Sequence, residues 1–384
     1  MDKSFLTEFK QREYYNQCTD FDALNEIMKA KPIRAYIGFD CTAKSLHVGS
    51  LLQIMCLRML QKHGHQPIVL LGGGTTRIGD PSGKEETRKM LSDKEIETNI
   101  KNIQKVFNIF LKTSNSKIKP IFVNNYKWLG KLNYIKFLRE IGKHFTINKM
   151  LNFDSVKLRL DREQSLSYME FNYMILQAYD FLELNKNKNC IMQIGGSDQW
   201  GNIINGVELI KRYSGKQSFG LTTPLITLAS GAKMGKTESG AVWLDKTLLS
   251  PYDYWQFWRN TDDRDVIRFL KMFTDLTLKK IDEIKNNNIN ELKILLANEA
   301  TAMLHGKSSA KKAEQTAKKT FGSGSVGDDL PTIKIDKKEL EVCIKINNQA
   351  IDDQNLQVSL KNFNNQNFLK LSLGKKKHVI IKIN

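Results

Sequence analysis

The segment from residue 35 to residue 71 restricts the fold more than any other part of this sequence. An apolar run at 35–39 predicts a strand, and a polar loop follows it. Apolar residues then recur at helical spacing across 51–59, and Gly64 marks the expected helix end. A second apolar run at 68–71 predicts another strand. Two strands joined by a helix indicate a parallel pair, and therefore an α/β sheet of the nucleotide-binding type.

The loop between the first strand and the helix is suited to an anion. His47 and Ser50 lie one turn apart where the helix begins. A helix N-terminus attracts negative charge, because its first N–H groups are unpaired and its dipole is positive there. We therefore expect a phosphate or a sugar to lie beside these two side chains.

The alternation of strands and helices continues along the chain and then stops. The further elements expected are a helix at 92–111, a strand at 118–123, a helix at 167–184, a strand at 190–194 and a helix at 203–213. Residues 126–165 interrupt this alternation and predict an insertion. The pattern from 251 to 319 is helical throughout, and the run 322–327 has the composition of a flexible linker.

The charge balance points to a polyanionic partner. The chain has 59 Lys and Arg against 41 Asp and Glu, a formal net charge of +18. Such an excess favours nucleic acid binding, although a Lys- and Asn-rich composition, as at 185–189, explains the charge equally well. The hydrophobic content of 41% over 384 residues is enough for the cores of two or three domains.

The cysteines and the N-terminal residues indicate the cellular compartment in which the protein is expected. Five cysteines are scattered without the paired spacing of metal ligands, which favours a reducing cytoplasm and predicts no protein-bound metal site. The first residues lack an apolar signal core, and no run reaches the length of a membrane span. We therefore expect a cytoplasmic protein that does not enter a membrane.

Three polar side chains share one face of the helix expected at 167–184. Tyr173, Gln177 and Asp180 are spaced so that a phenol, an amide and a carboxylate point the same way. Hydrogen-bonding groups in this arrangement suit a ligand better than a core. A solvent-exposed face remains the alternative, because Met174 and Phe181 would still bury the helix from other sides.

Glycines and polar residues follow the strand expected at 190–194. Gly195 and Gly196 end the strand, and Asp198 and Gln199 come directly after them. The carboxyl edge of a parallel sheet is where ligands bind, and glycines allow the backbone to approach a ribose or base. A turn with a polar cap is the alternative interpretation.

Two further loops carry charges suited to phosphate. The loop 229–239 holds Lys233 and Lys236, and its Gly-Lys-Thr ending does not have the glycine spacing of a P-loop. Lysines in such a loop are suited to a triphosphate and its departing pyrophosphate. Asp80 lies in a turn after the second strand, as an ammonium ligand or as a simple turn residue, with Lys84 and Arg88 nearby as phosphate candidates.

Together these segments resemble the bacterial tyrosyl-tRNA synthetases, which belong to the class I aminoacyl-tRNA synthetases. The resemblance runs from about residue 34 to about residue 320. The run His47-Val48-Gly49-Ser50 is similar to the HIGH motif, and Lys233-Met234-Gly235-Lys236-Thr237 to the KMSKS loop. Ser50 stands where that motif has its second histidine, so we expect a weaker contact there.

The resemblance implies a role for each candidate residue. Tyr36 and Asp180 would bind the phenol of tyrosine, while Asp80, Tyr173 and Gln177 would bind its ammonium group. Gln193 and Gln199 would complete the tyrosine site, with Gln199 near the reacting carboxylate. The residues implied for ATP binding are Gly38, Asp40, His47, Gly49, Ser50, Gly196, Asp198, Lys233, Met234 and Lys236. The catalytic residues implied are Thr42 and His47 at the γ-phosphate, and Lys84, Arg88, Lys233 and Lys236 on the pyrophosphate.

The implied reaction is that of a ligase. The tyrosine carboxylate, already ionised at neutral pH, would attack the α-phosphate of ATP and form tyrosyl-adenylate and pyrophosphate. The tyrosyl group would then pass to the 3′ end of tRNA(Tyr). Mg²⁺ would be bound through the ATP phosphates, without a metal site on the protein. Positioning and electrostatic stabilisation would supply the catalysis.

The resemblance also implies a domain order and a homodimer. A Rossmann-type α/β catalytic domain is expected at 1–240, with a dimer-interface insertion near 126–165. An all-α anticodon-side domain at 241–320 and a linker at 321–330 would follow. The tail at 331–384 would be a small, basic α+β RNA-binding module in incomplete form, because the helical middle of that module is missing.

Three other functions compete with this interpretation. A tryptophanyl enzyme is disfavoured, because Tyr36 and Asp180 suit a phenol and not an indole. A non-catalytic RNA-binding protein that retains the synthetase fold is disfavoured by the intact His47 and Lys233. A generic nucleotidyltransferase would explain His47 but not the helical segment after Pro251.

Overall fold

The computed structural model divides the chain into two compact units. Unit 1 comprises residues 1–244 and 267–283, and unit 2 comprises residues 245–266 and 284–384. The described residues are 4–81, 91–111, 118–231, 234–237, 240–319, 332–334, 345–347, 349–350, 362–363, 368–373 and 377–382. The segment 267–283, which the sequence analysis assigned to the helical domain, groups with unit 1.

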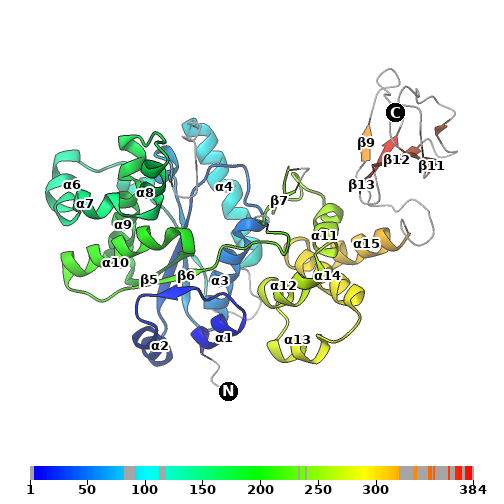
Figure 1. Cartoon of the computed structure of the whole chain (residues 1–384), viewed down its shortest axis with the longest axis horizontal. Helices are drawn as coiled ribbons and strands as arrows, with labels where there is room; N and C mark the ends of the chain where they lie inside the picture. Colours follow the sequence, from blue (N-terminus) through cyan, green and yellow to red (C-terminus); the bar gives the residue numbers. More distant parts are fainter. Residues whose placement is uncertain are drawn as a thin grey trace. The chain divides into compact units, whose positions relative to one another are not determined.

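Unit 1 is built on a six-stranded sheet with the order β1-β6-β5-β2-β3-β4 (Figure 1). Its strands are β1 (Gln17–Cys18), β2 (Arg34–Phe39), β3 (Gln66–Leu71), β4 (Ile121–Asn124), β5 (Cys190–Gly196) and β6 (Phe219–Thr223). All neighbouring strands are parallel except β1, which pairs antiparallel with β6. The predicted α/β class with a parallel sheet is confirmed.

The strand order reverses between β2 and β5. From β2 the chain moves through β3 to β4, and it then returns to β5 and β6 on the other side of β2. Ligands of open parallel sheets bind beyond the carboxyl ends of the strands at such a reversal. The topology therefore places a ligand site beyond Phe39 and Gly196.

Helices cover both faces of this sheet (Figure 1). On one face lie α3 (Leu51–Lys62) and α4 (Asp93–Phe110), and on the other lie α9 (Tyr168–Lys188) and α10 (Trp200–Ser214). The ring of Tyr36 on β2 packs against Phe181 on α9, with 5.3 Å between the ring centroids. Beyond α3, Gly64 has a φ of +85°, the left-handed conformation expected at the helix end.

The insertion between β4 and α9 consists of short helices. These are α5 (Tyr126–Leu129), α6 (Tyr134–Glu140), α7 (Ile147–Leu151) and α8 (Asp154–Asp161). The insertion contributes Ile141, Met150 and Val156 to the core that also contains Tyr36 and Phe181. The predicted interruption of the strand–helix alternation is therefore a helical layer attached to the sheet through α9.

The N-terminal residues hold the segment 267–283 against the rest of unit 1. The guanidinium of Arg12, just after α1 (Phe5–Gln11), donates to the carbonyl oxygens of Lys271 at 2.7 Å and Leu276 at 2.9 Å. The hydroxyl of Tyr14 donates to the carbonyl of Met272 at 2.6 Å. These contacts explain why α12 (Val266–Phe273) and α13 (Leu278–Ile284) group largely with unit 1. Helix α2 (Phe21–Ala30) completes the N-terminal region.

Unit 2 contains helices followed by strands. Its helices are α11 (Pro251–Arg259), α14 (Ile289–His305) and α15 (Lys307–Lys318). The strands are β9 (Thr332–Lys334), β10 (Lys345–Ile346), β11 (Gln349–Ala350), β12 (Phe368–Leu373) and β13 (Lys377–Lys382), in the order β11-β10-β12-β13-β9. The helical pattern predicted for 251–319 is confirmed. Among the described residues after 331 there is no α-helix.

Within the described part of the chain, no helix combines the length and the apolar character that a membrane crossing requires. Cys18, Cys41, Cys56 and Cys190 are free thiols. Cys343 lies outside the described residues.

Candidate active site

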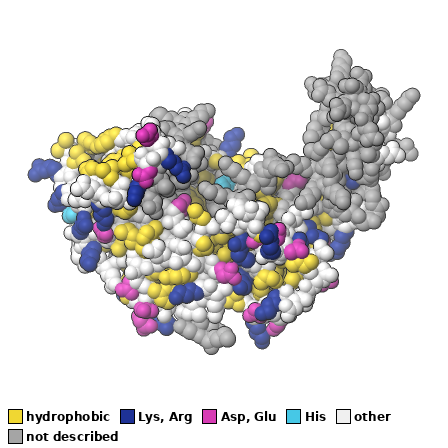
Figure 2. Space-filling model, in the orientation of Figure 1, with side chains coloured by type: hydrophobic (Ala, Val, Ile, Leu, Met, Phe, Trp, Pro, Cys, Tyr) yellow, Lys and Arg dark blue, Asp and Glu magenta, His cyan; other side chains and the backbone are white. Residues whose placement is uncertain are grey.

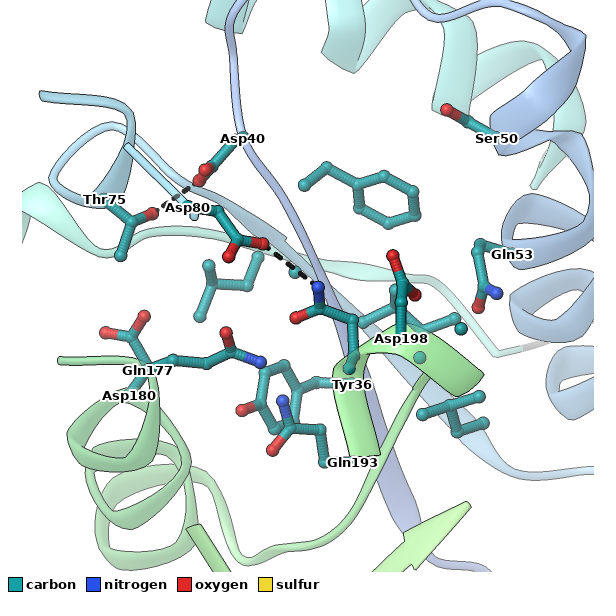
Figure 3. Close-up of a pocket in the computed structure, with 18 of the residues that line it drawn as sticks. Tyr36, Asp40, Ser50, Gln53, Thr75, Asp80, Gln177, Asp180, Gln193 and Asp198 are labelled. Carbon is teal, nitrogen blue, oxygen red and sulfur yellow. Dashed lines mark hydrogen bonds between the residues drawn. The ribbon is translucent and has the colours of Figure 1, made fainter. Parts of the chain in front are cut away.

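A cavity of about 290 Å³ opens where the strand order reverses (Figure 3). The end of β2, the end of β5, the start of α3 and the polar face of α9 all contribute to it. Its lining contains Tyr36, Ile37, Gly38, Phe39, Asp40, Gly49, Ser50, Gln53, Leu70, Thr75, Asp80, Tyr173, Gln177, Asp180, Gln193, Ile194, Gly195, Gly196, Asp198, Gln199 and Leu225. The size and the mixture of apolar walls with convergent polar groups are those of a small-molecule site.

Asp180 is a buried carboxylate held by two donors. Its side chain accepts a hydrogen bond of 2.8 Å from Asn125 Nδ2 and one of 2.7 Å from Trp128 Nε1. Burial raises the pKa of Asp180 to about 7, although these two donors act in the opposite direction. The group therefore changes its charge near neutral pH.

Three buried polar atoms of cavity-lining residues have no protein partner in the described structure. The hydroxyl oxygen of Tyr36, Oε1 of Gln53 and Oε1 of Gln193 are inaccessible to solvent and make no hydrogen bond there. Burial also raises the pKa of Tyr36, so the phenol is neutral. Buried polar groups in folded proteins nearly always have partners. A bound molecule with hydrogen-bonding groups would supply such partners within the cavity.

A chain of amides connects Asp80 to α9. Gln199 Nε2 donates to the carboxylate of Asp80 at 3.0 Å (Figure 3). Asn202 Nδ2 donates to Oε1 of Gln199 at 3.2 Å and to Oε1 of Gln177 at 3.0 Å. The loop after β3, the start of α10 and the face of α9 are thus held together around one wall of the cavity.

Asp40 directly follows β2, and its carboxylate accepts two hydrogen bonds from other elements. Thr75 Oγ1 donates to it at 2.7 Å and the hydroxyl of Tyr173 donates at 3.1 Å. Tyr173, Gln177 and Asp180 all line the cavity from α9, as their helical spacing predicts. That they bind a ligand stays a prediction.

The loop that contains His47 lies next to the loop 229–239 and the residues directly after it. His47 forms an isolated antiparallel bridge with Trp243, and their ring centroids are 6.2 Å apart. In the neighbouring residues, the N–H of Val48 donates to the carbonyl of Val242 at 2.9 Å. His47 Nδ1 accepts from the N–H of Gly49 at 3.0 Å, which assigns the ring proton to Nε2.

Most candidate residues of the sequence analysis meet at the cavity. Those that line it are Tyr36, Gly38, Asp40, Gly49, Ser50, Asp80, Tyr173, Gln177, Asp180, Gln193, Gly196, Asp198 and Gln199. Three described candidates do not line it, namely Thr42, His47 and Met234. Lys84, Arg88 and Lys233 lie outside the described residues, and Lys236 is described only through its backbone in β7 (Lys236–Thr237).

Sequence reasoning missed several residues that build this site. Asn125 follows the end of β4, as the polar residues after β2 and β5 follow theirs, so its position at a strand end was a usable signal. Trp128 lies in the insertion, and nothing in its spacing indicates a contact with Asp180. Gln53 and Thr75 also line the cavity. Gln53 lies on a helix that is largely apolar, and Thr75 lies in a turn, so neither position stood out in the sequence.

Comparison with known proteins identifies the family. A family model described as "tRNA synthetases class I (W and Y)" matches residues 28–322. The chain is 64% identical over 406 aligned residues to a protein named tyrosine–tRNA ligase from Pelagibacter ubique, covering 99% of each chain. It is 52% identical to the protein of the same name from Xanthobacter autotrophicus, covering 98% of this chain and 97% of that one. The chain belongs to the bacterial tyrosyl-tRNA synthetases.

Solved structures agree with this membership. A C-terminally truncated mitochondrial tyrosyl-tRNA synthetase from Aspergillus nidulans superposes with a TM-score of 0.74 at 31% identity, covering 83% of this chain and 95% of that one. A tryptophanyl-tRNA synthetase from Plasmodium falciparum shares only the fold, with a TM-score of 0.59 at 14% identity, covering 80% of this chain and 84% of that one.

The alignment with the Pelagibacter synthetase is longer than the 384 residues of this chain, so it contains gaps in this chain. The family is one of ATP-using synthetases, which is compatible with ATP as a substrate.

Proposed function

We propose that this synthetase activates L-tyrosine with ATP and transfers it to the 3′ end of tRNA(Tyr). The observation that supports this proposal best is the pair formed by Tyr36 and Asp180. One contributes a buried phenol without a protein partner, and the other contributes a buried carboxylate held by two donors. A substrate hydroxyl can donate to the carboxylate and accept from the phenol, so both groups gain partners.

This arrangement selects tyrosine over phenylalanine. Phenylalanine would fill the same space but leave Asp180 and Tyr36 without the hydroxyl that satisfies them. A buried polar group that loses its partner costs about 1–3 kcal/mol, and more when it is charged. Gln193, whose Oε1 also lacks a partner, would complete the polar end of the tyrosine site.

The ammonium group of tyrosine would be bound on the wall formed by Asp80, Gln177 and Tyr173. Asp80 is 9% exposed and supplies the opposite charge. Gln199 donates its amide hydrogen to Asp80, and it would lie near the reacting carboxylate of tyrosine. A cation here would be paired and hydrogen-bonded, which a buried charge requires.

The adenosine part of ATP would lie toward the other end of the cavity, beside Gly38, Asp40, Gly196 and Asp198. Its phosphates would extend to the loop of Thr42 and His47, where Nε2–H of His47 is a donor. Gly49, Ser50 and Met234 accompany this loop. Lys84, Arg88, Lys233 and Lys236 would bind the pyrophosphate.

The chemistry requires little from the protein beyond position and charge. The tyrosine carboxylate is ionised at neutral pH, so its attack on the α-phosphate needs no general base. The protein would align the two substrates and stabilise the charge that develops on the departing pyrophosphate. Mg²⁺ would be bound through the ATP phosphates. The described residues contain no group of three or more His, Cys, Asp or Glu side chains arranged to bind a metal.

A homodimer interface is proposed on the insertion. Large apolar side chains are exposed along α6, α7, α8 and the start of α9, and hydrophobic side chains gather over this region in Figure 2. They are Tyr134, Ile135, Leu138, Ile147, Leu151, Leu160 and Tyr168. An exposed apolar surface of this kind marks a protein interface, and a second copy of the chain can cover it through two-fold symmetry.

The remaining assignments follow the domain order. The net charge of +18 fits a tRNA partner. The helices of unit 2 would lie on the anticodon side of the tRNA, and the strands after residue 331 would form the shortened RNA-binding tail. A cytoplasmic location, expected from the scattered cysteines, stays a prediction.

Pyrophosphate exchange tests the proposal. The purified chain is incubated with ATP, labelled pyrophosphate and each of the twenty amino acids in turn. Exchange that depends on tyrosine supports the activity, and its absence would favour a non-catalytic RNA-binding protein with the synthetase fold. Charging of tRNA(Tyr) with labelled tyrosine then tests the second step.

A further inference from the structure

We propose that Asn99 is a positioning residue that orients Thr42 for the γ-phosphate of ATP. Asn99 lies on α4, outside the cavity, and it acts through the peptide group that joins Cys41 to Thr42. The inference rests on the function proposed above, in which Thr42 contacts the γ-phosphate. It adds a residue that belongs to none of the motifs.

The first observation is a buried amide on the apolar face of α4. Asn99 is 5% exposed, and it shares its face of the helix with the fully buried Ile96, Ile103 and Phe107. Since residues three or four apart are neighbours on a helix, this position suits an apolar side chain. A buried amide is normally hydrogen-bonded, so its partner indicates why a polar residue stands here.

The partner of Asn99 is a backbone carbonyl. Asn99 Nδ2 donates to the carbonyl oxygen of Cys41 at 2.9 Å. Cys41 is fully buried and lies outside the strands and helices, directly after Asp40. A buried backbone carbonyl needs a hydrogen-bond donor, and in this loop Asn99 supplies it in place of a neighbouring strand.

The second observation is that the same stretch is held from another element. The N–H of Cys41 donates to Oγ1 of Thr76 at 2.7 Å. Thr75, which precedes Thr76 in the short 3₁₀ helix after β3, donates to the carboxylate of Asp40 at 2.7 Å. Two consecutive threonines therefore hold two consecutive residues, and Asn99 fixes the remaining polar group of the Cys41 backbone.

The third observation is the change from buried to exposed at the next residue. Cys41 is buried, whereas Thr42 is exposed. The carbonyl that Asn99 holds belongs to the same peptide plane as the N–H and the Cα atom of Thr42. A rotation of this peptide would therefore redirect the Thr42 side chain. The Asn99 hydrogen bond fixes the plane from which that side chain departs.

The packing of α4 does not depend on this amide alone. Phe107, two turns after Asn99 on the same face, contacts Phe39 at the end of β2, with 4.7 Å between the ring centroids. Helix α4 thus touches the chain on both sides of Asp40, through an apolar contact at Phe39 and a polar one at Cys41. Removal of the amide should disturb the orientation of Thr42 more than the docking of the helix.

The test removes the donor and keeps the size of the side chain. Asn99→Leu places an apolar group on the apolar face of α4. Asn102→Leu is the matched control, because Asn102 lies one turn further along α4 and accepts from Lys105 at 3.2 Å. Single-turnover formation of tyrosyl-adenylate measures the rate constant at saturating ATP, equilibrium binding measures the Kd for tyrosine, and thermal melting measures stability.

We expect Asn99→Leu to lower the rate constant for adenylate formation about 3- to 10-fold, as the loss of one positioning hydrogen bond implies. A misplaced group at the γ-phosphate affects the transition state, so the Kd for tyrosine should stay within about twofold. Asn102→Leu should react at the wild-type rate. Thr76→Val should reproduce the effect from the other side of Cys41, and Thr76→Ser should restore the rate.

A double-mutant cycle shows whether Asn99 acts through Thr42. Thr42→Val removes the hydroxyl assigned to the γ-phosphate. In that background Asn99→Leu should slow adenylate formation by less than about twofold, because the group that it orients is already missing. Ile103→Ala is a second control, since it leaves a cavity beside the same face of α4 and removes no hydrogen bond to the loop.

Three results would overturn the inference. The first is a wild-type rate in Asn99→Leu, or in Thr76→Val if Asn99→Leu does not fold. The second is full additivity of Asn99→Leu and Thr42→Val. The third is an equal loss of rate in Ile103→Ala at an equal loss of Tm, because a merely structural role of Asn99 predicts that result. Absence of tyrosyl-adenylate formation in the wild-type chain contradicts the proposed function itself, which is a separate outcome.

Discussion

The indole N–H of Trp128 donates a hydrogen bond of 2.7 Å to the buried carboxylate of Asp180. Trp128 belongs to α5 of the insertion, whereas Asp180 belongs to α9, which packs against the sheet. The insertion that carries the exposed apolar surface therefore also holds a carboxylate that lines the cavity. A substitution of Trp128 would act directly on the proposed tyrosine site.

Trp128→Phe should weaken tyrosine binding without unfolding the chain. The substitution removes the N–H donor and keeps an aromatic ring, so Asp180 loses a hydrogen bond to a charged group worth about 1.5–3 kcal/mol. We expect KM for tyrosine to rise about 10- to 100-fold at pH 7, with KM for ATP little changed. Trp255→Phe is the matched control, because Trp255 Nε1 donates to Asn298 in unit 2. Equal effects of the two substitutions would argue against a role of Trp128 in the pocket.

The efficiency toward tyrosine should depend on pH through Asp180. Burial raises the pKa of this carboxyl to about 7, so it becomes protonated as the pH falls below that value. Protonation removes the charged acceptor for the substrate phenol, so kcat/KM for tyrosine should fall about tenfold per pH unit below pH 7. Trp128→Phe should move this transition to higher pH, because the lost donor stabilises the ionised form. A flat profile between pH 6 and pH 8 would contradict this role of Asp180.

The sequence predicts the residues that line the cavity better than it predicts the residues that hold them in place. The strand–helix–strand pattern at 35–71 and the glycines after 190–194 both mark chain positions that the sheet topology brings to one edge. Tyr173, Gln177 and Asp180 are recognisable because helical periodicity relates them within one element. Local periodicity is enough where one element, or one sheet edge, carries the site.

The residues that hold the lining side chains in place act through contacts between elements that are distant in the sequence. Trp128 and Asp180 are 52 residues apart, and Gln53 and Thr223 are 170 apart. No local pattern encodes such pairs, because the hydrogen bonds arise only when the sheet and its helices are assembled. For the same reason, Gln53 looks like an ordinary polar position on a largely buried helix until its unsatisfied oxygen is seen in the cavity.

The exposed apolar side chains of the insertion should be required for dimer formation. Ile135 is 64% exposed on α6, and a glutamate there would place a charge within the proposed interface. We expect Ile135→Glu to shift the chain from dimer to monomer in sedimentation equilibrium at micromolar concentration. Ile109 on α4 is 46% exposed outside the insertion, so Ile109→Glu is the control and should remain dimeric. A dimer that persists in Ile135→Glu would place the interface elsewhere.

The contact between the two motif loops leads to the last prediction. Gly235 has a φ of +117°, and a Cβ atom there would lie 2.7 Å from Nδ1 of His47 and 3.1 Å from the backbone nitrogen of Gly49. Gly231 in the same loop also has a positive φ, of +82°, but a Cβ atom there would meet nothing within 4 Å. Alanine at either position strains the backbone, and only Gly235→Ala also displaces His47.

Gly235→Ala should therefore slow tyrosyl-adenylate formation more than Gly231→Ala. Crowding in a packed region costs about 1–3 kcal/mol, and a loss of transition-state stabilisation of this size through displacement of His47 would lower kcat by a further 5- to 150-fold, roughly. Single-turnover formation of the adenylate measures this step apart from tRNA charging. KM for tyrosine should change little in both variants, because neither glycine lines the cavity. Equal rates in the two variants would mean that the position of His47 beside this loop does not affect the reaction, and that backbone strain alone accounts for the loss.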